Sequence, residues 1–189
     1  MTASPGPRIP LLARAEWDAY TTELLSGAVP GGRQGATSNL LMTLAHDSSL
    51  LELFMTCVRR LLVNSSLPVR DRELVVLRSA WLCQAAYAWA EHVRIARAAG
   101  LTAADIERAA GGPQTGGWDG FELALVQAVD QLHATATIGE ETWQVLASRY
   151  SAGQLIELPM LAGLYHLVSW TQNAAGIPPN PGSAGLAAR

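Results

Sequence analysis

The chain has 189 residues, enough for one domain to bury a hydrophobic core without disulfides or a structural metal. All 13 basic residues are arginine, so a Schiff-base lysine, a P-loop lysine and a lysine-bound pyridoxal phosphate are excluded. The net charge of −3 and the scattered arginines give no basic stripe, which argues against a nucleic-acid partner.

Almost every periodic segment of the sequence has the spacing of an α-helix. Apolar residues recur at intervals of three and four, and no convincing alternation of β-branched residues occurs. The predicted fold class is therefore all-α, in a single domain that spans residues 1–189.

The first third of the chain is predicted to hold an extended arm followed by helices. Its segments, in chain order, are a Pro-rich arm at 1–15, a helix near 16–26, a Gly-rich loop at 29–37, a short helix at 39–45 and a helix ending near 64. Asp47 and Ser48 are residue types that cap the start of the last of these helices. The Gly-rich loop is expected to be mobile or to form part of a pocket.

The middle of the chain, residues 68–100, is predicted to form a long helical segment. Pro68 suits the first turn of a helix, and Gly100 suits the position just past its end.

The last third of the chain has clear helix boundaries. Thr102 is expected to start a short helix, Ser151 and Gln154 form a capping box, and Pro159 is expected to kink the helix that follows. The remaining segments are a loop at 111–117, helices at 118–133 and 139–150, a final helix that stops at Gly176, and a Pro/Gly tail at 177–189.

The central segment reads PVRDRELVVLRSAWLCQAAYAWAEHVRIARAAG and contains Glu73 and His92. It resembles the carboxymuconolactone decarboxylase and AhpD-like superfamily, whose signature sets a Glu upstream of a CxxC and then a His. In this chain the two cysteine positions hold Ala85 and Ala88. The resemblance covers roughly residues 8–178 and implies an AhpD-like helical domain with a central helical hairpin, assembled as a trimer or hexamer. A charged content of only 15% agrees with a homo-oligomer.

The loss of both motif cysteines changes the chemistry that the resemblance implies. In the AhpD-like branch the cysteines are the redox pair, and the Glu and His relay protons to the thiol. Without those thiols nothing remains to attack a peroxide, so dithiol peroxidase activity is not expected. What remains is similar to the decarboxylase side of the superfamily, with Tyr87, Trp89 and His92. This implies acid–base catalysis by Glu73 and His92 without a cofactor.

Cooperation between Glu73 and His92 requires a break in the helix. On a continuous helix the nineteen positions between them would span about 28 Å, too far to share a proton. A turn near residues 83–85 would fold the two side chains back toward one ligand, and the resemblance implies that a second helix begins at Ala85 or Ala86. A Glu73 carboxylate turned into an apolar pocket would have the raised proton affinity that a general base needs.

The second helix is expected to present Ala85, Ala88, Trp89 and His92 on one face. The two small residues would leave space beside an aromatic wall and an imidazole, which suits a flat, anionic or oxygenated ring. The structural alternative is that Ala88 permits close helix packing and His92 is a hydrogen-bonded core histidine.

Four further side chains are candidates for substrate contacts. His166 follows Pro159 in a helix rich in small residues, His46 resembles a family stretch at the pocket mouth, and His133 lies on an apolar face. Cys83 lies two residues too early for the motif, so it is either a small buried hydrophobe or a redox-sensitive thiol near the pocket. None of the histidines has metal-ligand spacing, and no metal is predicted.

The leading functional hypothesis is a cofactor-independent lyase or isomerase of the carboxymuconolactone decarboxylase type. Its substrate would be a small carboxylated or polyoxygenated cyclic molecule. The alternatives are a dehydratase or cyclase of specialised metabolism and a non-catalytic small-molecule binding protein. Two cysteines without a disulfide framework, no signal peptide and no apolar run long enough for a bilayer predict a cytoplasmic protein with no membrane partner.

Overall fold

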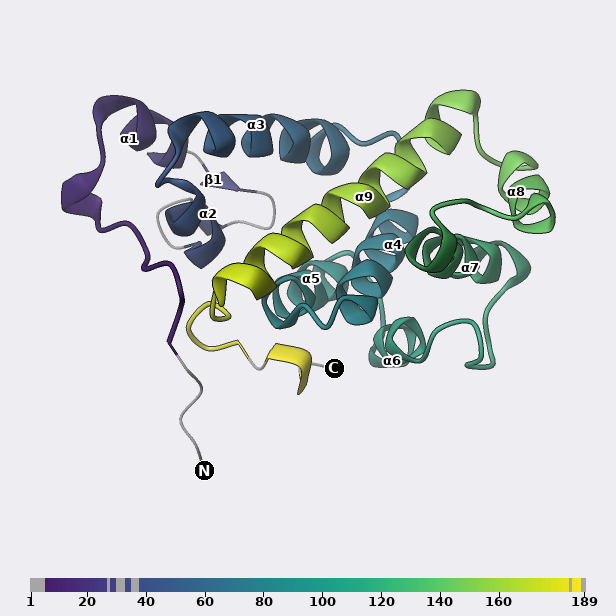
Figure 1. The fold of residues 1–189 in the computed structure, drawn as a ribbon. Coiled ribbons are helices and arrows are strands. Elements are labelled where there is room, and N and C mark those ends of the chain that lie inside the picture. The colour runs from purple at the N-terminus through teal and green to yellow at the C-terminus, as the bar shows by residue number, and fades with distance from the viewer. Residues whose placement is uncertain (1–5, 27, 30–32, 35–37, 184, 188–189) are drawn as a thin grey trace.

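The computed structural model describes residues 6–26, 28–29, 33–34, 38–183 and 185–187, and the fold over these residues is all-α (Figure 1). Within the described residues, one antiparallel pair of short strands, β1 (Ala28–Val29) with β2 (Arg33–Gln34), interrupts the helices. The helices are α1 (Ala19–Ser26), α2 (Asn39–Leu44), α3 (Ser48–Val58), α4 (Val69–Leu82), α5 (Ala86–Ala98), α6 (Ala103–Gly111), α7 (Gly120–Thr135), α8 (Glu140–Ala147) and α9 (Ala152–Ala175). A π-helical turn, η3 (Arg59–Val63), extends α3, and short 3₁₀ turns lie at η1 (Arg14–Glu16) and η4 (Gly185–Ala187).

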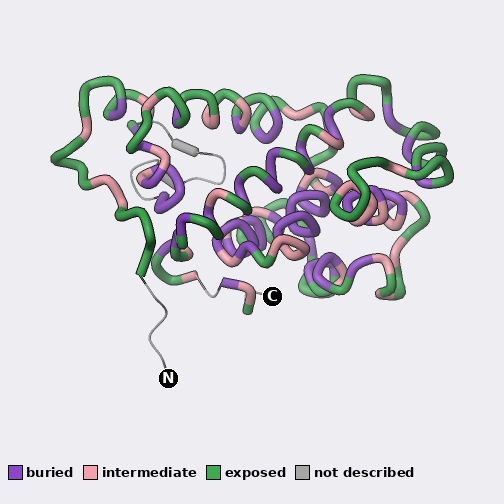
Figure 2. Tube along the Cα trace, in the orientation of Figure 1, coloured by how far each residue is buried: buried purple, intermediate pink, exposed green. Residues whose placement is uncertain are grey.

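Helix α4 forms the centre of the molecule, with α5, α6, α7 and α9 packed around it. Its residues 73–77 are buried regardless of helical face, as expected for a helix surrounded by others (Figure 2). The long yellow-green helix α9 crosses α4 and α5 in Figure 1 and covers the hairpin that they form. The expected central helical hairpin is therefore confirmed.

The break between α4 and α5 lies where the sequence predicted it. Cys83 ends α4, and Gln84 has φ of 52°, in the left-handed region that reverses the chain direction. Ala85 then caps α5, which begins at Ala86. Because the amide of Ala85 donates to the carbonyl of Ala80, the turn is tied back onto the helix that it ends.

Most predicted helix limits agree with the structure, and two helix starts differ for local reasons. The first helix begins at Ala19, because the Asp18 carboxylate accepts a hydrogen bond from the amide of Thr21. Helix α7 begins at Gly120, because Asp119 caps it. Helix α9 contains Pro159 and runs for 24 residues between the predicted limits at Ser151 and Gly176. The Gly-rich loop at 29–37 lies largely outside the described residues.

The segment after α9 is packed against the body of the protein, although the sequence suggested only a tail. Ile177 and Asn180 are buried. The Asn180 side chain accepts from the amide of Asn39 and donates to Tyr87 Oη and Glu91 Oε1. The tail therefore braces the start of α2 against α5.

Ala136, the residue that ends α7, gives a simple test of backbone strain. It is exposed and has φ of 58°, a left-handed conformation that costs an alanine about 1 kcal/mol more than a glycine. We expect Ala136→Gly to raise the melting temperature by about 2–4 °C. Ala134→Gly is the matched control, since Ala134 is exposed in the same helix and has helical geometry. This variant should lose up to about 1 kcal/mol in the free energy of unfolding. Equal changes of the same sign in both variants would contradict the assignment.

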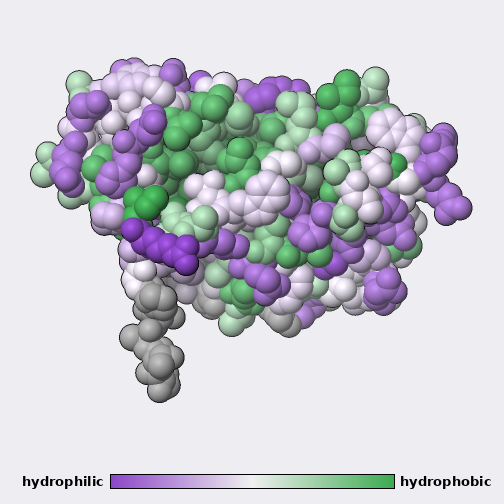
Figure 3. Space-filling view, viewed as in Figure 1, coloured by the Kyte–Doolittle hydropathy of each residue, from purple (hydrophilic) through white to green (hydrophobic). Residues whose placement is uncertain are grey.

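Apolar surface gathers over α3 and α9 (Figure 3). A groove between these helices, the α3–α9 groove, is lined by residues that include Leu44, Leu50, Leu53, Phe54, Leu167 and Val168. No helix in the described ranges combines the length and apolar character needed to cross a bilayer.

Candidate functional site

The hairpin brings Glu73 of α4 and His92 of α5 into direct contact. Glu73 Oε2 lies 2.7 Å from His92 Nδ1, and both side chains are buried, Glu73 completely. The chain reversal at Gln84 thus brings together two side chains that are nineteen residues apart in the sequence.

The imidazole is held on both sides. Tyr165 of α9 places its hydroxyl oxygen 2.5 Å from His92 Nε2, and its ring meets the imidazole edge-on with centroids 4.8 Å apart. A carboxylate only accepts hydrogen bonds, so His92 Nδ1 carries the proton and donates to Glu73. In the neutral imidazole Nε2 is then the acceptor, and Tyr165 donates to it. The basic nitrogen of His92 therefore faces Tyr165.

Glu73 differs electrostatically from the sequence-based expectation. Burial alone would raise its pKa, but the charge and hydrogen bond of His92 and those of Arg72 outweigh burial and hold the pKa below its usual 4.5. Arg72 Nε donates to Glu73 Oε1 at 3.0 Å, and its Nη1 donates to the carbonyl of Leu62. The raised proton affinity expected for Glu73 is thus wrong. Glu73 is an ionised partner that orients His92.

A pocket of about 90 Å³ lies next to the imidazole. His92 and Tyr165 both line it, and Ala88 provides the open space that its short side chain was expected to leave. Its other polar lining groups are Ser38, Tyr87 and Glu91, and the remaining described walls are apolar, from α2, α3, η3, α5 and α9. This volume suits a small ring rather than an extended ligand.

Tyr87 lines the pocket as expected for a substrate-binding residue. Its hydroxyl lies 2.8 Å from Ser38 Oγ and accepts a hydrogen bond from Asn180 at 3.1 Å. Burial raises the pKa of Tyr87, so the hydroxyl stays protonated at neutral pH and can donate to a ligand.

Trp89 does not form the expected aromatic wall. It is fully buried and packs against Trp81 with ring centroids 5.0 Å apart, and it is not among the described residues that line the pocket. One residue further along a helix turns the side chain by about 100°, so Ala88 faces the pocket while Trp89 faces α4. Ala85 is also buried in the core rather than in the lining.

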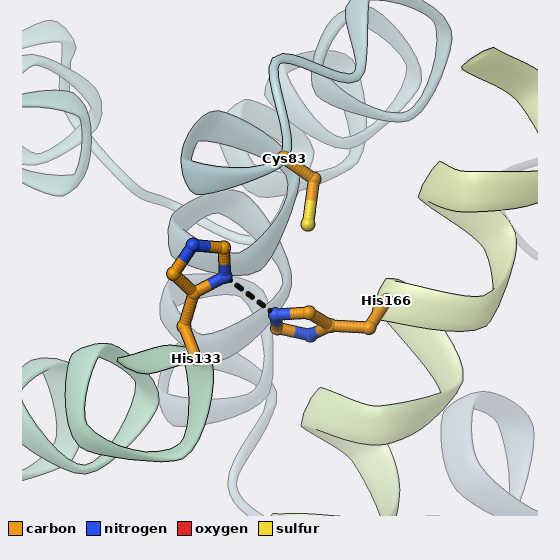
Figure 4. A group of neighbouring side chains, drawn as sticks. All are labelled: Cys83, His133 and His166. Carbon is orange, nitrogen blue, oxygen red and sulfur yellow. Dashed lines mark hydrogen bonds between the residues drawn. The ribbon is translucent and has the colours of Figure 1, made fainter. Parts of the chain in front are cut away.

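The other four predicted contact residues lie away from this pocket. Cys83, His133 and His166 come together in a separate cluster (Figure 4). Burial and the neighbouring His166 lower the pKa of His133, and burial raises the pKa of Cys83. His46 lies near the N-terminal arm, where its Nε2 is 2.8 Å from the carbonyl oxygen of Pro10.

Three pocket residues were not predicted from the sequence: Tyr165, Ser38 and Glu91. Tyr165 directly precedes His166, and at this point in α9 the sequence drew attention to the histidine rather than to the tyrosine. A signal existed only in the mixture of small residues around Gly163, which indicated that a pocket opens along this helix.

The chain and its fold both have recognisable relatives. Residues 49–131 match the model of the carboxymuconolactone decarboxylase family. An AhpD-core, peroxidase-related protein from Ralstonia eutropha JMP134 has a similar structure, with a TM-score of 0.78 at 16% identity over 95% of each chain. A peroxidase-related protein from Silicibacter sp. TM1040 has a TM-score of 0.68 at 18% identity, over 75% of this chain and 76% of that chain. A search of the curated proteins gave no significant match.

A third similar structure is a variant of the debrominase Bmp8 in complex with 2,3,4-tribromopyrrole, with a TM-score of 0.68 at 15% identity over 95% of each chain. These likenesses define the fold as AhpD-like. The matched segment contains Glu73, His92 and the alanines at the two cysteine positions. The family match over residues 49–131 and the AhpD-like fold agree with the resemblance found in the sequence.

Proposed function

We propose that the protein is a cofactor-independent lyase or isomerase in which His92 is the general base and acid. The family match and the small-molecule enzyme among its structural neighbours support an enzyme that acts on a small molecule. The observation that carries the proposal is the buried line of hydrogen bonds from Glu73 through His92 to Tyr165 at the wall of the pocket. Its chemistry is the acid–base type implied by the family without the motif cysteines.

The proposed reaction begins at a carbon next to a carbonyl. His92 Nε2 takes the proton, the C–H electron pair becomes the C=C bond of an enolate, and the carbonyl oxygen gains the charge. The imidazolium that forms is stabilised by the Glu73 carboxylate, which is ionised because its pKa is lowered. Tyr165, released from Nε2, turns its hydroxyl proton toward the enolate oxygen. Return of the proton to another carbon gives an isomer, and loss of a leaving group gives a lyase product.

The charges around the pocket favour a neutral oxygenated ring over a carboxylated one. Glu91 lines the pocket, whereas none of its described lining residues is an arginine. A substrate carboxylate would therefore approach the Glu91 carboxylate, whose ion pair with Arg94 at 3.6 Å weakens the repulsion without removing it. Within the two substrate classes considered, a polyoxygenated cyclic ketone or lactone without a carboxylate agrees better with the site.

Deuterium exchange tests this proposal even when the natural substrate is not identified. Small cyclic ketones and lactones, each paired with its carboxylated analogue, would be incubated in D₂O with the protein and followed by NMR. We expect enzyme-dependent exchange at the carbon next to the carbonyl, faster for the neutral member of a pair. Binding without exchange throughout the panel would favour the non-catalytic binding protein, and loss of water or ring closure would favour the dehydratase or cyclase.

We also propose that the protein is a homo-oligomer, as the low charge content suggested. The α3–α9 groove leaves large apolar side chains in solvent, with Leu53 61% and Leu167 53% exposed. Such continuous apolar surface is typical of a face covered by another subunit. We expect light scattering to give the mass of a trimer or hexamer and Leu53→Asp to reduce it. Val145→Asp on α8, at the far end of the molecule in Figure 1, is the matched control; a monomeric wild-type mass would contradict the proposal.

A further inference from the structure

A second constellation of reactive side chains lies outside the pocket, where three helices meet. Cys83 comes from the end of α4, His133 from the last turn of α7 and His166 from the middle of α9. Figure 4 shows the thiol and both imidazoles directed toward one another. One ligand atom from each residue lies within 4.8 Å of the other two.

The hydrogen bonds of His166 leave its Nε2 unprotonated and facing the other residues of this cluster. Its Nδ1 is 2.8 Å from the carbonyl oxygen of Ala162, which only accepts, so Nδ1 carries a proton. In the neutral imidazole Nε2 is then unprotonated, and it lies 2.9 Å from His133 Nδ1. A histidine with one ring nitrogen donating to a backbone carbonyl and the other unprotonated has the orientation typical of a metal ligand.

The geometry points to a three-ligand site for a borderline transition-metal ion of the zinc class, formed by Cys83 Sγ, His133 Nδ1 and His166 Nε2. Around a tetrahedral Zn²⁺ with bonds of about 2.3 Å to sulfur and about 2.0–2.1 Å to nitrogen, ligand atoms are separated by about 3.3–3.6 Å. The separation between the two histidine nitrogens is slightly shorter than this, and no pair exceeds 4.8 Å. Side-chain adjustments of about 1 Å therefore suffice to enclose an ion.

The chemistry of the three side chains favours this class of ion. One thiolate and two imidazoles suit Zn²⁺ and its close relatives, whereas Mg²⁺ and Ca²⁺ require oxygen ligands. On binding, the thiol proton leaves to solvent, and His133 changes tautomer so that its proton moves from Nδ1 to Nε2. His133 is exposed, which gives the ion and the released proton a path to water. Three protein ligands leave the fourth position for a water molecule, as in catalytic rather than structural zinc sites.

This site would correct the prediction of no metal, which rested on spacing along the sequence. Cys83, His133 and His166 are separated by 50 and 33 residues, and no short motif contains them. The inference does not depend on the proposed acid–base function, because none of the three residues is among the described lining of the pocket.

Metal titration of the full-length, tag-free protein tests the assignment. After treatment with a chelator and dialysis, Zn²⁺ would be titrated by calorimetry, and Co²⁺ would be added as a spectroscopic probe. We expect one Zn²⁺ per chain, and for Co²⁺ the thiolate charge-transfer and intense d–d absorption of a tetrahedral site. Cys83→Ser, His133→Ala and His166→Gln should each weaken Zn²⁺ binding at least about 10-fold, and Cys83→Ser should abolish the thiolate band.

Two matched controls come from the same chain. Cys57→Ser removes the other free cysteine, and His46→Ala removes a histidine far from the cluster. Both should keep wild-type Zn²⁺ affinity and the Co²⁺ spectrum. Circular dichroism would verify folding. Because His133 is exposed, its substitution should disturb the core least among the three ligand variants. Absence of binding in the wild type, equal weakening in the controls, or a Co²⁺ complex without thiolate absorption would each overturn the assignment.

Discussion

His92→Gln should lower the turnover number at least about 100-fold while the protein stays folded. The substitution removes the basic Nε2, and loss of a positioned general base costs about 10²–10⁴-fold in rate. The side-chain amide still offers polar atoms to Glu73 and Tyr165, so the buried carboxylate keeps a partner. The measurement is the rate of deuterium exchange at saturating substrate, with circular dichroism as the test of folding.

Glu73→Gln tests the role of Glu73 in orienting the His92 imidazole while the imidazole itself is kept. A glutamine can donate to His92 Nδ1, which forces the proton to Nε2 and removes the lone pair that faces Tyr165. We expect a loss in turnover comparable to that of His92→Gln. Wild-type rates in both variants would refute the acid–base site.

Two tyrosine variants complete this experiment. Tyr165→Phe removes the hydroxyl next to Nε2 and should lower turnover if that hydroxyl stabilises the enolate. Tyr150→Phe is the matched control, because Tyr150 also donates a buried hydrogen bond, 2.7 Å to Asp71, but is not among the described pocket residues. It should lower stability and leave turnover unchanged. Equal losses of turnover in both variants would show that Tyr165 acts only through the fold.

The pH dependence of stability gives an independent check on Glu73. Its folded-state pKa is depressed below the usual 4.5, so the ionised carboxylate stabilises the fold above that pH. This contribution is lost progressively as the pH falls from 4.5 toward the folded-state pKa. Glu73→Gln should therefore flatten the acid side of the stability curve, as measured by urea denaturation at several pH values. An unchanged acid side would show that Glu73 does not titrate as a stabilising ion.

Local signals in the sequence were sufficient for the helices and for the hairpin. Caps at Asp47, Ser151 and Gly176 set three helix ends, since each depends only on residues within one turn. The need for a break between Glu73 and His92 followed from helix geometry alone, and the structure supplies it at Gln84.

Contacts between distant segments could not be predicted in this way. Periodicity shows which residues share a helical face, but it does not show which neighbour that face meets; Trp89 was therefore assigned to the pocket although it packs on Trp81. Tyr165 reaches His92 across 73 residues of sequence, and Asn180 reaches Tyr87 across 93. Such partners depend on how α9 and the segment after it fold over the hairpin, which no local pattern specifies.

Arg78→Met should produce the largest loss of stability among the charged residues. Arg78 is 7% exposed at the centre of α4 and binds Asp130 of α7 through two hydrogen bonds of 2.5 and 2.8 Å. Its third nitrogen donates to the carbonyls of Ala109 and Ala110 at the end of α6. Methionine has a similar length but no donor, so one substitution leaves a carboxylate and two carbonyls without their partner. We expect a loss of about 3–5 kcal/mol in the free energy of unfolding.

Urea denaturation at fixed protein concentration measures this loss, and three comparisons identify its cause. Arg78→Lys keeps the charge but not the planar guanidinium with its several donors, and it should lose less stability than Arg78→Met. Arg60→Met removes an exposed arginine whose ion pair with Glu157 should contribute about 1 kcal/mol or less. Adding Asp130→Leu to Arg78→Met removes the unpaired carboxylate and should restore part of the stability. If Arg78→Met were no more costly than Arg60→Met, the three helices would be held by apolar packing alone, and the buried guanidinium would serve only to align them.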